Sequence, residues 1–583
     1  MSPTPFRALS MLVATLVLAA CGGEPPPNSG AAPPAGVARS VTRPSQILIT
    51  IEAFAGRRVV PFGGTIAMPR LAELVLAGTT YDDAVSTATL SRPALVTILT
   101  GVSPDRSGVR DNIHDALSKD LPTLAEGAKN AGYETAAFVS TPFASYSSGL
   151  QRGFELFDGP EPIVIGPAQH VPPVVKADVI AGHVKEWLAS RTSDAPYFAW
   201  IHLSNLNGLS VPLPHAKLQK GEKAPNDLAA YDAALASIDG AIGAIVEVVR
   251  ADPRSSKAEW TVAGTHGTYL GEGGRYGDPF WLANETLSVP VVRILDPGAH
   301  PSAARHDARP TWLPDVAATL ALAMGVKLDA QAEGVPLEAA PPADRARLAW
   351  GYALDDQLGW PPQTAVREGV GFSATNAAAA ARPALPRRRV LSAEARAAIE
   401  RAGLRLGTPS AQVPPKDPDT WLRDLQLVRR FDGADRPGLA ARRSKILMEG
   451  APDALASLVT RLYFFTTMPS KEGPALRSKL LARYPSRSDA LHWAAHVSLV
   501  DKQYDGAAAL LEAAMEVGPV EPEMYYDLAC VRSLRGDSKG ALAELDRALA
   551  AGYRNWDWID KDPDLSAARA DAGFPALLRT HGR

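Results

Sequence analysis

A histidine and a glutamate occupy a glycine-rich loop, GTHGTYLGEGG at residues 264–274, directly after an apolar run. The two residues are His266 and Glu272. Parallel α/β folds bind their ligands in loops of this kind, because the carboxyl ends of the strands meet at one edge of the sheet. Imidazole and carboxylate groups transfer protons or bind metal ions. Their neighbours Thr265 and Gly273 offer no acid and no carboxylate ligand for the same chemistry.

Short apolar runs alternate with helical patterns from Gln46 onward, and these elements must position the loop. Strands that are apolar on both faces and separated by helices predict an α/β fold, with a mostly parallel sheet covered by helices on both faces. We expect strands at 47–52, 134–140, 197–203 and 260–264, and helices at 68–78, 92–101, 121–132, 176–190 and 227–250.

Several segments resemble the sulfatase branch of the alkaline-phosphatase superfamily in their order and spacing. They are ILITIE at 47–52, SRPALVTILTGVSPDRSGVRDN at 91–112, LPTLAEGAKNAGYETAAFVS at 121–140, YFAWIHL at 197–203, YDAALASIDGAIGAIV at 231–246 and THGTYLGEGG at 265–274. The resemblance covers roughly residues 46–375 and implies a sulfatase-like domain. It also implies hydrolysis of sulfate or phosphate esters with a divalent metal, which both polarises the ester and activates the nucleophile.

The resemblance assigns the metal and nucleophile positions residue by residue. Glu52 and Thr265 occupy positions where the family has an aspartate ligand, and His266 retains its position. Ser91 occupies the nucleophile position. Conversion of that residue to formylglycine requires an arginine where this chain has Leu95, so Ser91 would act as a plain alcohol.

The other charged and acid–base side chains to consider are partly present and partly replaced in this chain. Arg92, Arg106 and Arg110 are candidates to line an anion pocket, and ordinary surface arginines are the alternative. Glu272 is retained, whereas histidines expected in the family are replaced by Ser107, Asn207, Gly273 and a residue near Asp278. Each absent acid or base removes a factor of about 10² to 10⁴ from proton transfer.

Simpler structural roles compete with these assignments. Ser91 precedes a helical run and suits a helix N-cap. Glu52 could cap the following helix, and His266 could hydrogen-bond to the backbone of its own loop. His202 lies in an apolar strand and is expected to be a hydrogen-bonded core residue.

Two functions follow from this comparison. The first is a non-catalytic binding or scaffold protein, a pseudoenzyme with no cofactor, whose α/β domain binds an anionic glycan, ester, lipid headgroup or protein. The second is a surviving hydrolase that uses Ser91 with a divalent ion (Ca, Mg, Zn or Mn) on Glu52, Thr265 and His266. Metal occupancy discriminates between them.

The N-terminus predicts export and membrane attachment. Residues 1–20 contain one arginine and a short apolar run, and Leu18–Ala20 before Cys21 resembles a bacterial lipobox. Lipidation of Cys21 would anchor the chain in the bacterial cell envelope, through a Pro- and Gly-rich tether at 21–45. The alternative is a plain signal peptide that happens to contain a cysteine.

The C-terminal part is predicted to be helical. A linker at 376–390 and a helical connector at 391–452 lead to residues 453–583, where Gly506-Ala507 recurs as Gly540-Ala541. This 34-residue period resembles tetratricopeptide repeats and implies a protein partner, whereas generic helical hairpins are the alternative. His492 and His496 have a metal-binding spacing, but no nearby acidic or cysteine partner is predicted for them. Cys530 is expected to be a small core residue.

Composition excludes nucleic acid as a partner. The chain has 583 residues, a net charge of −3 and a pI of about 6.4. Its lysines and arginines form no basic stripe of the kind that holds a phosphate backbone.

Overall fold

The computed structural model describes residues 43–112, 115–145, 148–160, 174–206, 227–255, 257–277, 280–296, 298, 304–342, 345–351, 363–368, 371–374, 390–408, 421, 449–467, 472–518, 520 and 522–582. The predicted signal peptide with Cys21, nearly all of the predicted tether and linker, and most of the connector lie outside these residues. So do Asn207 and Asp278.

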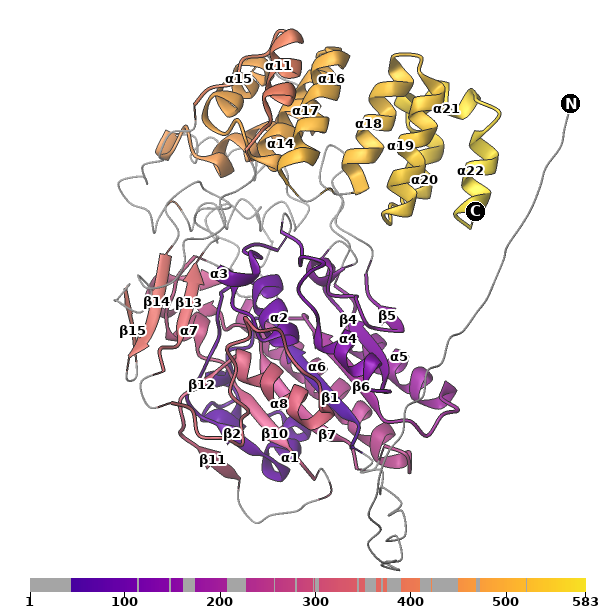
Figure 1. Cartoon of the computed structure of the whole chain (residues 1–583). Coiled ribbons are helices and arrows are strands. Elements are labelled where there is room, and N and C mark those ends of the chain that lie inside the picture. Colours follow the sequence, from indigo (N-terminus) through magenta and orange to yellow (C-terminus); the bar gives the residue numbers. More distant parts are fainter. Residues whose placement is uncertain are drawn as a thin grey trace, which may run out of the picture. The chain divides into compact units, whose positions relative to one another are not determined.

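An eight-stranded sheet forms the centre of the α/β part (Figure 1). Its order is β11 (Arg305–Asp307), β2 (Thr79–Tyr81), β10 (Val291–Ile294), β7 (Glu259–Gly264), β1 (Gln46–Ile51), β6 (Tyr197–Leu203), β4 (Glu134–Val139) and β5 (Leu156–Asp158). β10 runs antiparallel to both of its neighbours, whereas the other pairs are parallel. The sheet is therefore mostly parallel, as the sequence predicts.

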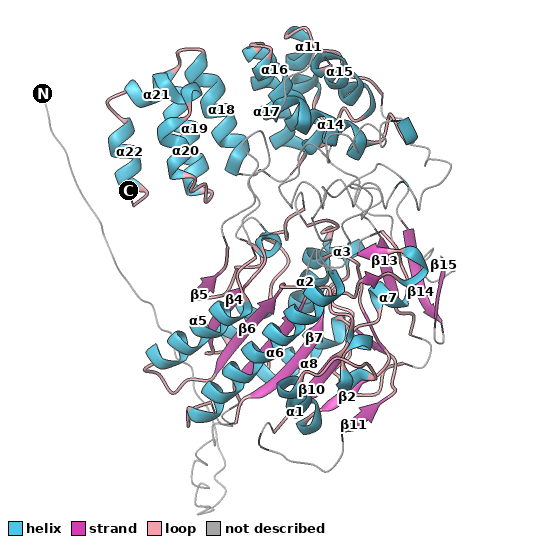
Figure 2. Cartoon of the chain, turned by 180° about the vertical axis from the view of Figure 1, so that it is seen from behind, coloured by secondary structure: helices cyan, strands magenta, loops and turns pink. Residues whose placement is uncertain are grey.

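Helices cover both faces of this sheet, because β1 is apolar in both directions (Figure 2). Ile47, Ile49 and Ile51 pack into one core with α1 (Pro69–Ala77), α5 (Ala177–Ser190) and α6 (Asp227–Ala251). Leu48 points the other way, into a core with α2 (Ser91–Thr100), α4 (Leu124–Asn130) and α8 (Pro314–Met324). Two short helices, α3 (Pro104–Ser107) and α7 (Asn284–Leu287), complete the described α-helices of this part.

The predicted strands and helices are confirmed to within three residues at each end. The strands that the sequence analysis did not predict are short or belong to small sheets. β3 (Ala84–Val85) pairs with β12 (Thr311–Trp312), and β8 (Tyr269–Leu270) pairs with β9 (Tyr276–Gly277). β13 (Leu348–Gly351), β14 (Gln363–Glu368) and β15 (Gly371–Ala374) form an antiparallel sheet. Such strands carry too few residues for an apolar period to be recognised.

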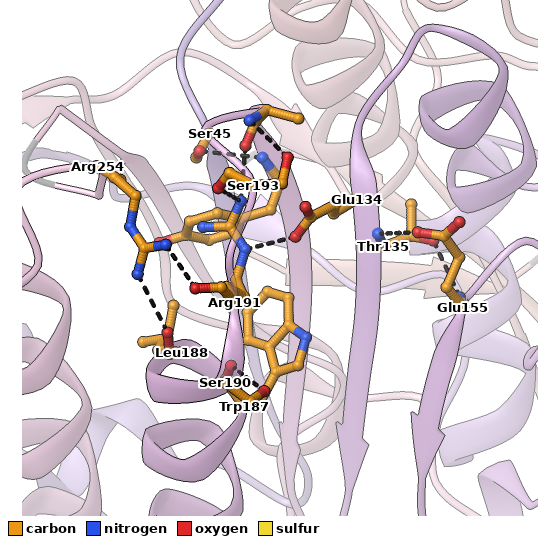
Figure 3. Close-up of polar contacts among 12 residues, drawn as sticks. Ser45, Glu134, Thr135, Glu155, Trp187, Leu188, Ser190, Arg191, Ser193 and Arg254 are labelled. Atoms are coloured by element: carbon orange, nitrogen blue, oxygen red, sulfur yellow. Dashed lines mark hydrogen bonds and ion pairs between the residues drawn. The ribbon is translucent and has the colours of Figure 1, made fainter.

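A buried arginine fastens the amino ends of β4 and β6 (Figure 3). Arg191 donates to Glu134 over 2.5 Å and to the Ala195 carbonyl over 2.7 Å, and it stacks 4.6 Å from the centre of the Tyr197 ring. Arg254 in turn donates to the Arg191 carbonyl over 2.6 Å. This network belongs to the edge of the sheet opposite the strand ends that lead into the predicted site.

The described C-terminal part is helical (Figure 1). Its main helices are α11 (Ala393–Arg401), α14 (Leu455–Thr467), α15 (Gly473–Arg483), α16 (Ser488–Val500), α17 (Tyr504–Val517), α18 (Pro522–Leu534) and α19 (Ser538–Ala550). The shorter α20 (Trp556–Lys561), α21 (Ser566–Ala570) and α22 (Phe574–Thr580) follow. Cys530 is buried in the core of α18 and α19, as expected for a small core residue.

None of the helices within the described ranges combines the length and apolar composition that a bilayer crossing requires.

Candidate functional site

The predicted site residues converge at the carboxyl edge of the central strands. Glu52 directly follows β1, and its amide donates to the Leu203 carbonyl at the end of β6 over 2.9 Å. Thr265 directly follows β7, and its amide donates to the Ile51 carbonyl over 3.0 Å. Ser91 starts α2. The backbone therefore brings Glu52, Ser91, Thr265 and His266 together, where parallel α/β folds bind ligands.

Glu52 is the centre of a hydrogen-bond network. The Ser91 hydroxyl donates to its Oε1, and the Ser204 hydroxyl donates to its Oε2. His202 Nε2 lies 3.4 Å from the same Oε2. The Glu52 residue is only 1% exposed, so these protein groups replace water around its carboxylate.

Thr50 and Trp200 fix the orientation of the His202 ring on the side away from Glu52. Trp200 Nε1 donates to Thr50 Oγ1 over 2.9 Å, and that hydroxyl lies 2.8 Å from His202 Nδ1. Because Thr50 Oγ1 already accepts from Trp200, its own proton is available for Nδ1. When Nδ1 accepts the Thr50 proton, the neutral ring carries its own proton on Nε2, the nitrogen that faces Glu52.

The surroundings keep Glu52 ionised. Burial by itself raises the pKa of a carboxyl group, but the His202 ring next to Oε2 acts in the opposite direction. The His266 ring and the Ser204 hydroxyl add to this, so that the pKa of Glu52 is below its usual value. A carboxylate with a lowered pKa is a weak general base at neutral pH.

Ser91 and His266 face each other at the limit of hydrogen bonding. Ser91 Oγ lies 3.4 Å from His266 Nε2, while His266 Nδ1 lies 2.9 Å from the Gly267 carbonyl. A carbonyl only accepts, so Nδ1 carries the ring proton, and the neutral ring directs its Nε2 lone pair toward Ser91. The predicted backbone contact of His266 is confirmed. The N-cap role proposed for Ser91 is wrong, because Leu90 is the N-cap and the Ser91 hydroxyl bonds to Glu52.

These donors do not fit a hard divalent cation. Mg²⁺ and Ca²⁺ prefer six or more oxygen ligands that include several carboxylates or waters. Glu52 is the single carboxylate of the set, and both of its oxygens accept hydrogen bonds from protein hydroxyls. Thr265 Oγ1 is buried and has no hydrogen-bond partner among the described residues, but a neutral hydroxyl is a weak ligand. No group of three or more His, Cys, Asp or Glu side chains converges in the described residues of the α/β part.

Two of the expected anion-binding arginines, Arg92 and Arg110, are buried, and the guanidinium of Arg92 is used within the protein. Arg92 is buried and donates to the Phe143 carbonyl over 2.8 Å and to the Asp115 carbonyl over 2.7 Å. The backbone amide of Arg110 donates to the Asp115 carboxylate over 2.8 Å, and its side chain is also buried. The guanidinium of Arg92 thus binds backbone oxygens of neighbouring loops.

Two further predicted residues lie outside the network around Glu52. Glu272 pairs with Arg57 over 2.5 Å and accepts from the Leu270 amide over 2.6 Å, with its side chain 40% exposed. Burial raises the pKa of Glu272, but these two contacts lower it below its usual value. Ser107 ends α3, and its hydroxyl accepts from the Val109 amide over 3.4 Å.

The sequence analysis missed Ser204 and Thr50 and did not connect His202 with Glu52. Ser204 directly follows the predicted strand 197–203, so its place at the carboxyl edge was the signal that could have identified it. Thr50 and His202 occupy opposed positions on paired strands, which only the register of β1 and β6 reveals.

Comparison with known proteins bears on this part of the chain. Residues 44–326 match the family model for sulfatases. Similar solved structures include BT1596, a 2-O GAG sulfatase, at 16% identity and a TM-score of 0.47, covering 56% of this chain and 81% of that one. The phosphonate monoester hydrolase of Agrobacterium radiobacter is 18% identical with a TM-score of 0.45, covering 56% and 86%. No curated protein matches the chain. The match over residues 44–326 shows that this part of the chain, a little under half of it, is similar to the sulfatases.

Proposed function

We propose that the protein is a non-catalytic member of the sulfatase group, a binding or scaffold lipoprotein that is anchored in the bacterial cell envelope. The observation that carries this proposal is the engagement of Glu52. The two carboxylate oxygens of Glu52 accept hydrogen bonds from the hydroxyls of Ser91 and Ser204. If Ser91 were the nucleophile, it would have to transfer its hydroxyl proton, and the group that accepts this hydrogen bond is a carboxylate of lowered pKa. A weak base and a buried hydroxyl make a poor hydrolase.

The substituted positions support the same conclusion. The resemblance requires an acid at Thr265, an arginine at Leu95 and a histidine at Gly273. Leu95 is buried in the core beneath α2, where it packs among apolar side chains. Gly273 has a positive φ of 58°, a left-handed conformation that glycine adopts without the steric cost of a Cβ. The local structure thus suits the residues present, rather than those that the chemistry needs.

The proposal also includes a membrane anchor at the N-terminus and an anionic ligand for the α/β domain. The lipobox at Leu18–Cys21 and the tether up to residue 45 support attachment to a membrane of the envelope. The α/β domain would bind an anionic glycan or a sulfate or phosphate ester, because members of the sulfatase family act on sulfate and phosphate esters.

The helical part would supply the surface for a protein partner. α16 and α18 begin 34 residues apart, at Ser488 and Pro522, and α17 and α19 also begin 34 residues apart, at Tyr504 and Ser538. This spacing supports tetratricopeptide-like repeats, which present extended surfaces to partners.

The alternative is an active hydrolase, and one contact favours it. Ser91 Oγ lies between a carboxylate and His266 Nε2, which is an arrangement of a nucleophile with two acceptors for its proton. In this function a divalent ion on Glu52, Thr265 and His266 would activate the ester.

A turnover assay distinguishes the two functions. The purified full-length chain is offered aryl sulfates, aryl phosphates and phosphonate monoesters with Ca²⁺, Mg²⁺, Zn²⁺ or Mn²⁺ in turn. The proposal expects no turnover above that of Ser91→Ala. The matched control is Ser190→Ala, an exposed serine that donates to the Trp187 carbonyl of its own helix. Turnover that survives in Ser190→Ala and disappears in Ser91→Ala would establish the hydrolase instead.

A further inference from the structure

Two histidines and an aspartate converge between helices of the C-terminal part. His492 and His496 lie one turn apart on α16, and Asp527 lies on α18. Histidines at i and i+4 present their rings on the same face of a helix, a spacing that metal sites use. Asp489, three residues before His492, pairs with Arg487. The acidic partner is Asp527, 35 residues after His492 in the chain.

The ligand atoms are close enough to share one ion. His492 Nε2 lies 2.7 Å from Asp527 Oδ2, and His496 Nε2 lies 3.2 Å from the same oxygen. One ligand atom from each of the three residues lies within 4.8 Å of the others. Zinc bonds of about 2.0 Å keep tetrahedral ligand atoms roughly 3.3 Å apart, so small side-chain rotations accommodate an ion.

One of these nitrogens lacks a hydrogen bond of its own. Both histidines are only 2% exposed. His496 Nε2 is buried and forms no hydrogen bond with acceptable geometry to any described residue, although Asp527 is near. A buried ring nitrogen without a well-formed hydrogen bond is costly unless another group binds it. A metal ion that is also bound to His492 and Asp527 would satisfy it.

The surroundings suit a structural ion. Leu491, Ala495, Met524 and Leu528 belong to the apolar core around these helices. The Asp527 side chain remains 16% exposed, which gives an ion a route from solvent. Two imidazoles and one carboxylate match Zn²⁺ and similar transition metals, whereas Ca²⁺ and Mg²⁺ prefer all-oxygen sites.

We propose that His492, His496 and Asp527 bind one Zn²⁺ or a similar divalent transition-metal ion, which joins α16 to α18. The ion clamps helices that belong to successive hairpins, so that the stack of helices becomes stiffer when metal is bound. This site is independent of Glu52 and of the function proposed for the α/β domain.

Zinc and cobalt binding to the full-length chain test the site. After chelator treatment, the protein should bind one equivalent of Zn²⁺, and unfolding of the helical part should move to higher temperature, because a ligand that binds the native state stabilises it. Co²⁺ should give the visible absorption of a low-coordinate site. Asp527→Asn and His496→Gln should weaken binding by about 100-fold or more, since even supporting residues outside the ligand set contribute 10- to 100-fold.

Two control variants test whether the ion binds to these three side chains. His581→Gln removes another histidine–aspartate pair of the helical part, His581 with Asp546 at 2.7 Å, and should leave zinc binding unchanged. Asp527→Cys should retain Co²⁺ and add a thiolate charge-transfer band that the wild-type chain, which already contains Cys530, does not show. Far-ultraviolet circular dichroism confirms that each variant is folded.

Three results would overturn the proposal. They are the absence of zinc binding by the folded wild-type chain, unchanged binding by folded Asp527→Asn and His496→Gln, and binding lost in Glu52→Gln instead. The last result would place the ion in the α/β domain.

Discussion

The Ser91 hydroxyl donates a hydrogen bond to Oε1 of Glu52 and so joins the first turn of α2 to the carboxyl end of β1. In a metal-dependent esterase, the nucleophile and the carboxylate would both be directed at the ion. Here each satisfies the other. Glu52 is thus paired with Ser91 and Ser204, which is how a protein stabilises a buried carboxylate without a ligand.

Ser91→Ala should lower the free energy of unfolding by about 1–3 kcal/mol, because it leaves a buried carboxylate oxygen without its donor. Chemical denaturation measures this difference. Ser190→Ala, on an exposed helix position, should change stability by less than about 0.5 kcal/mol. If Ser91→Ala is as stable as the wild type, the hydrogen bond to Glu52 contributes nothing and the site is not internally satisfied.

The ionised state of Glu52 predicts a pH dependence. Its folded pKa lies below the ordinary value of 4.5, so its contribution to stability is fully present above pH 4.5 and is lost as pH falls through the folded pKa. Glu52→Gln lacks this titration. The stability difference between wild type and Glu52→Gln, from denaturation between pH 6 and pH 3.5, should therefore shrink on acidification. A difference that stays constant would mean that Glu52 titrates alike in the folded and unfolded chains.

The sequence was sufficient for the sheet because its main strands are apolar on both faces and are bounded by helices. It also placed Glu52, Thr265 and His266 at one edge, since residues that follow parallel strands meet there, whereas Ser91 was assigned through the family resemblance. The partners of Glu52 required more than sequence. His202 reads as an ordinary residue of an apolar strand, and its contact with Glu52 depends on the register of β1 against β6.

Long-range pairing explains the other omission. His492 and His496 have metal-binding spacing, but a metal site needs a third ligand. Asp527 supplies it from α18, and its distance in the chain hid it from an analysis of local sequence. The packing of α16 near α18 brings these side chains together. The 34-residue period predicts repeated helix pairs but does not predict which side chains come into contact.

Cleavage within the predicted linker at 376–390 should release an α/β fragment and a helical fragment that fold separately. Each part has its own apolar cores, which is the property that lets domains fold alone. Limited proteolysis followed by calorimetry of the fragments measures this. Complete unfolding of either fragment, together with a single transition in the intact chain, would contradict the boundary.

Cys21→Ala should release the protein from membranes into the soluble fraction. The thiol of Cys21 is the predicted lipid attachment point, and residues 1–20 are predicted to be removed from the mature chain. Fractionation and mass spectrometry of the N-terminus measure both consequences. A variant that stays in the membrane fraction would require another anchor.

Thr265→Asp should make the stability of the chain depend on metal. Thr265 is fully buried beside His266, and its hydroxyl has no hydrogen-bond partner among the described residues. An aspartate there places a second carboxylate near Glu52, and two buried like charges repel unless a cation or a proton neutralises one of them. In the presence of a chelator, the variant should therefore be less stable than the wild type by several kcal/mol, the typical cost of a buried uncompensated charge. Added Ca²⁺ or Mn²⁺ should restore part of this loss, because binding to the native state alone stabilises it.

Wild-type stability should not respond to the same ions, because Glu52 is already satisfied by Ser91 and Ser204. Thr265→Val, which has nearly the same volume, is the matched control and should show no metal response. It removes a hydroxyl that lacks a partner, so it should cost little stability. Thermal unfolding with and without each ion measures all three proteins. A wild-type chain that is stabilised by Ca²⁺ or Mn²⁺ as strongly as Thr265→Asp would show that the existing donors already hold a metal, and the non-catalytic function would lose its main support.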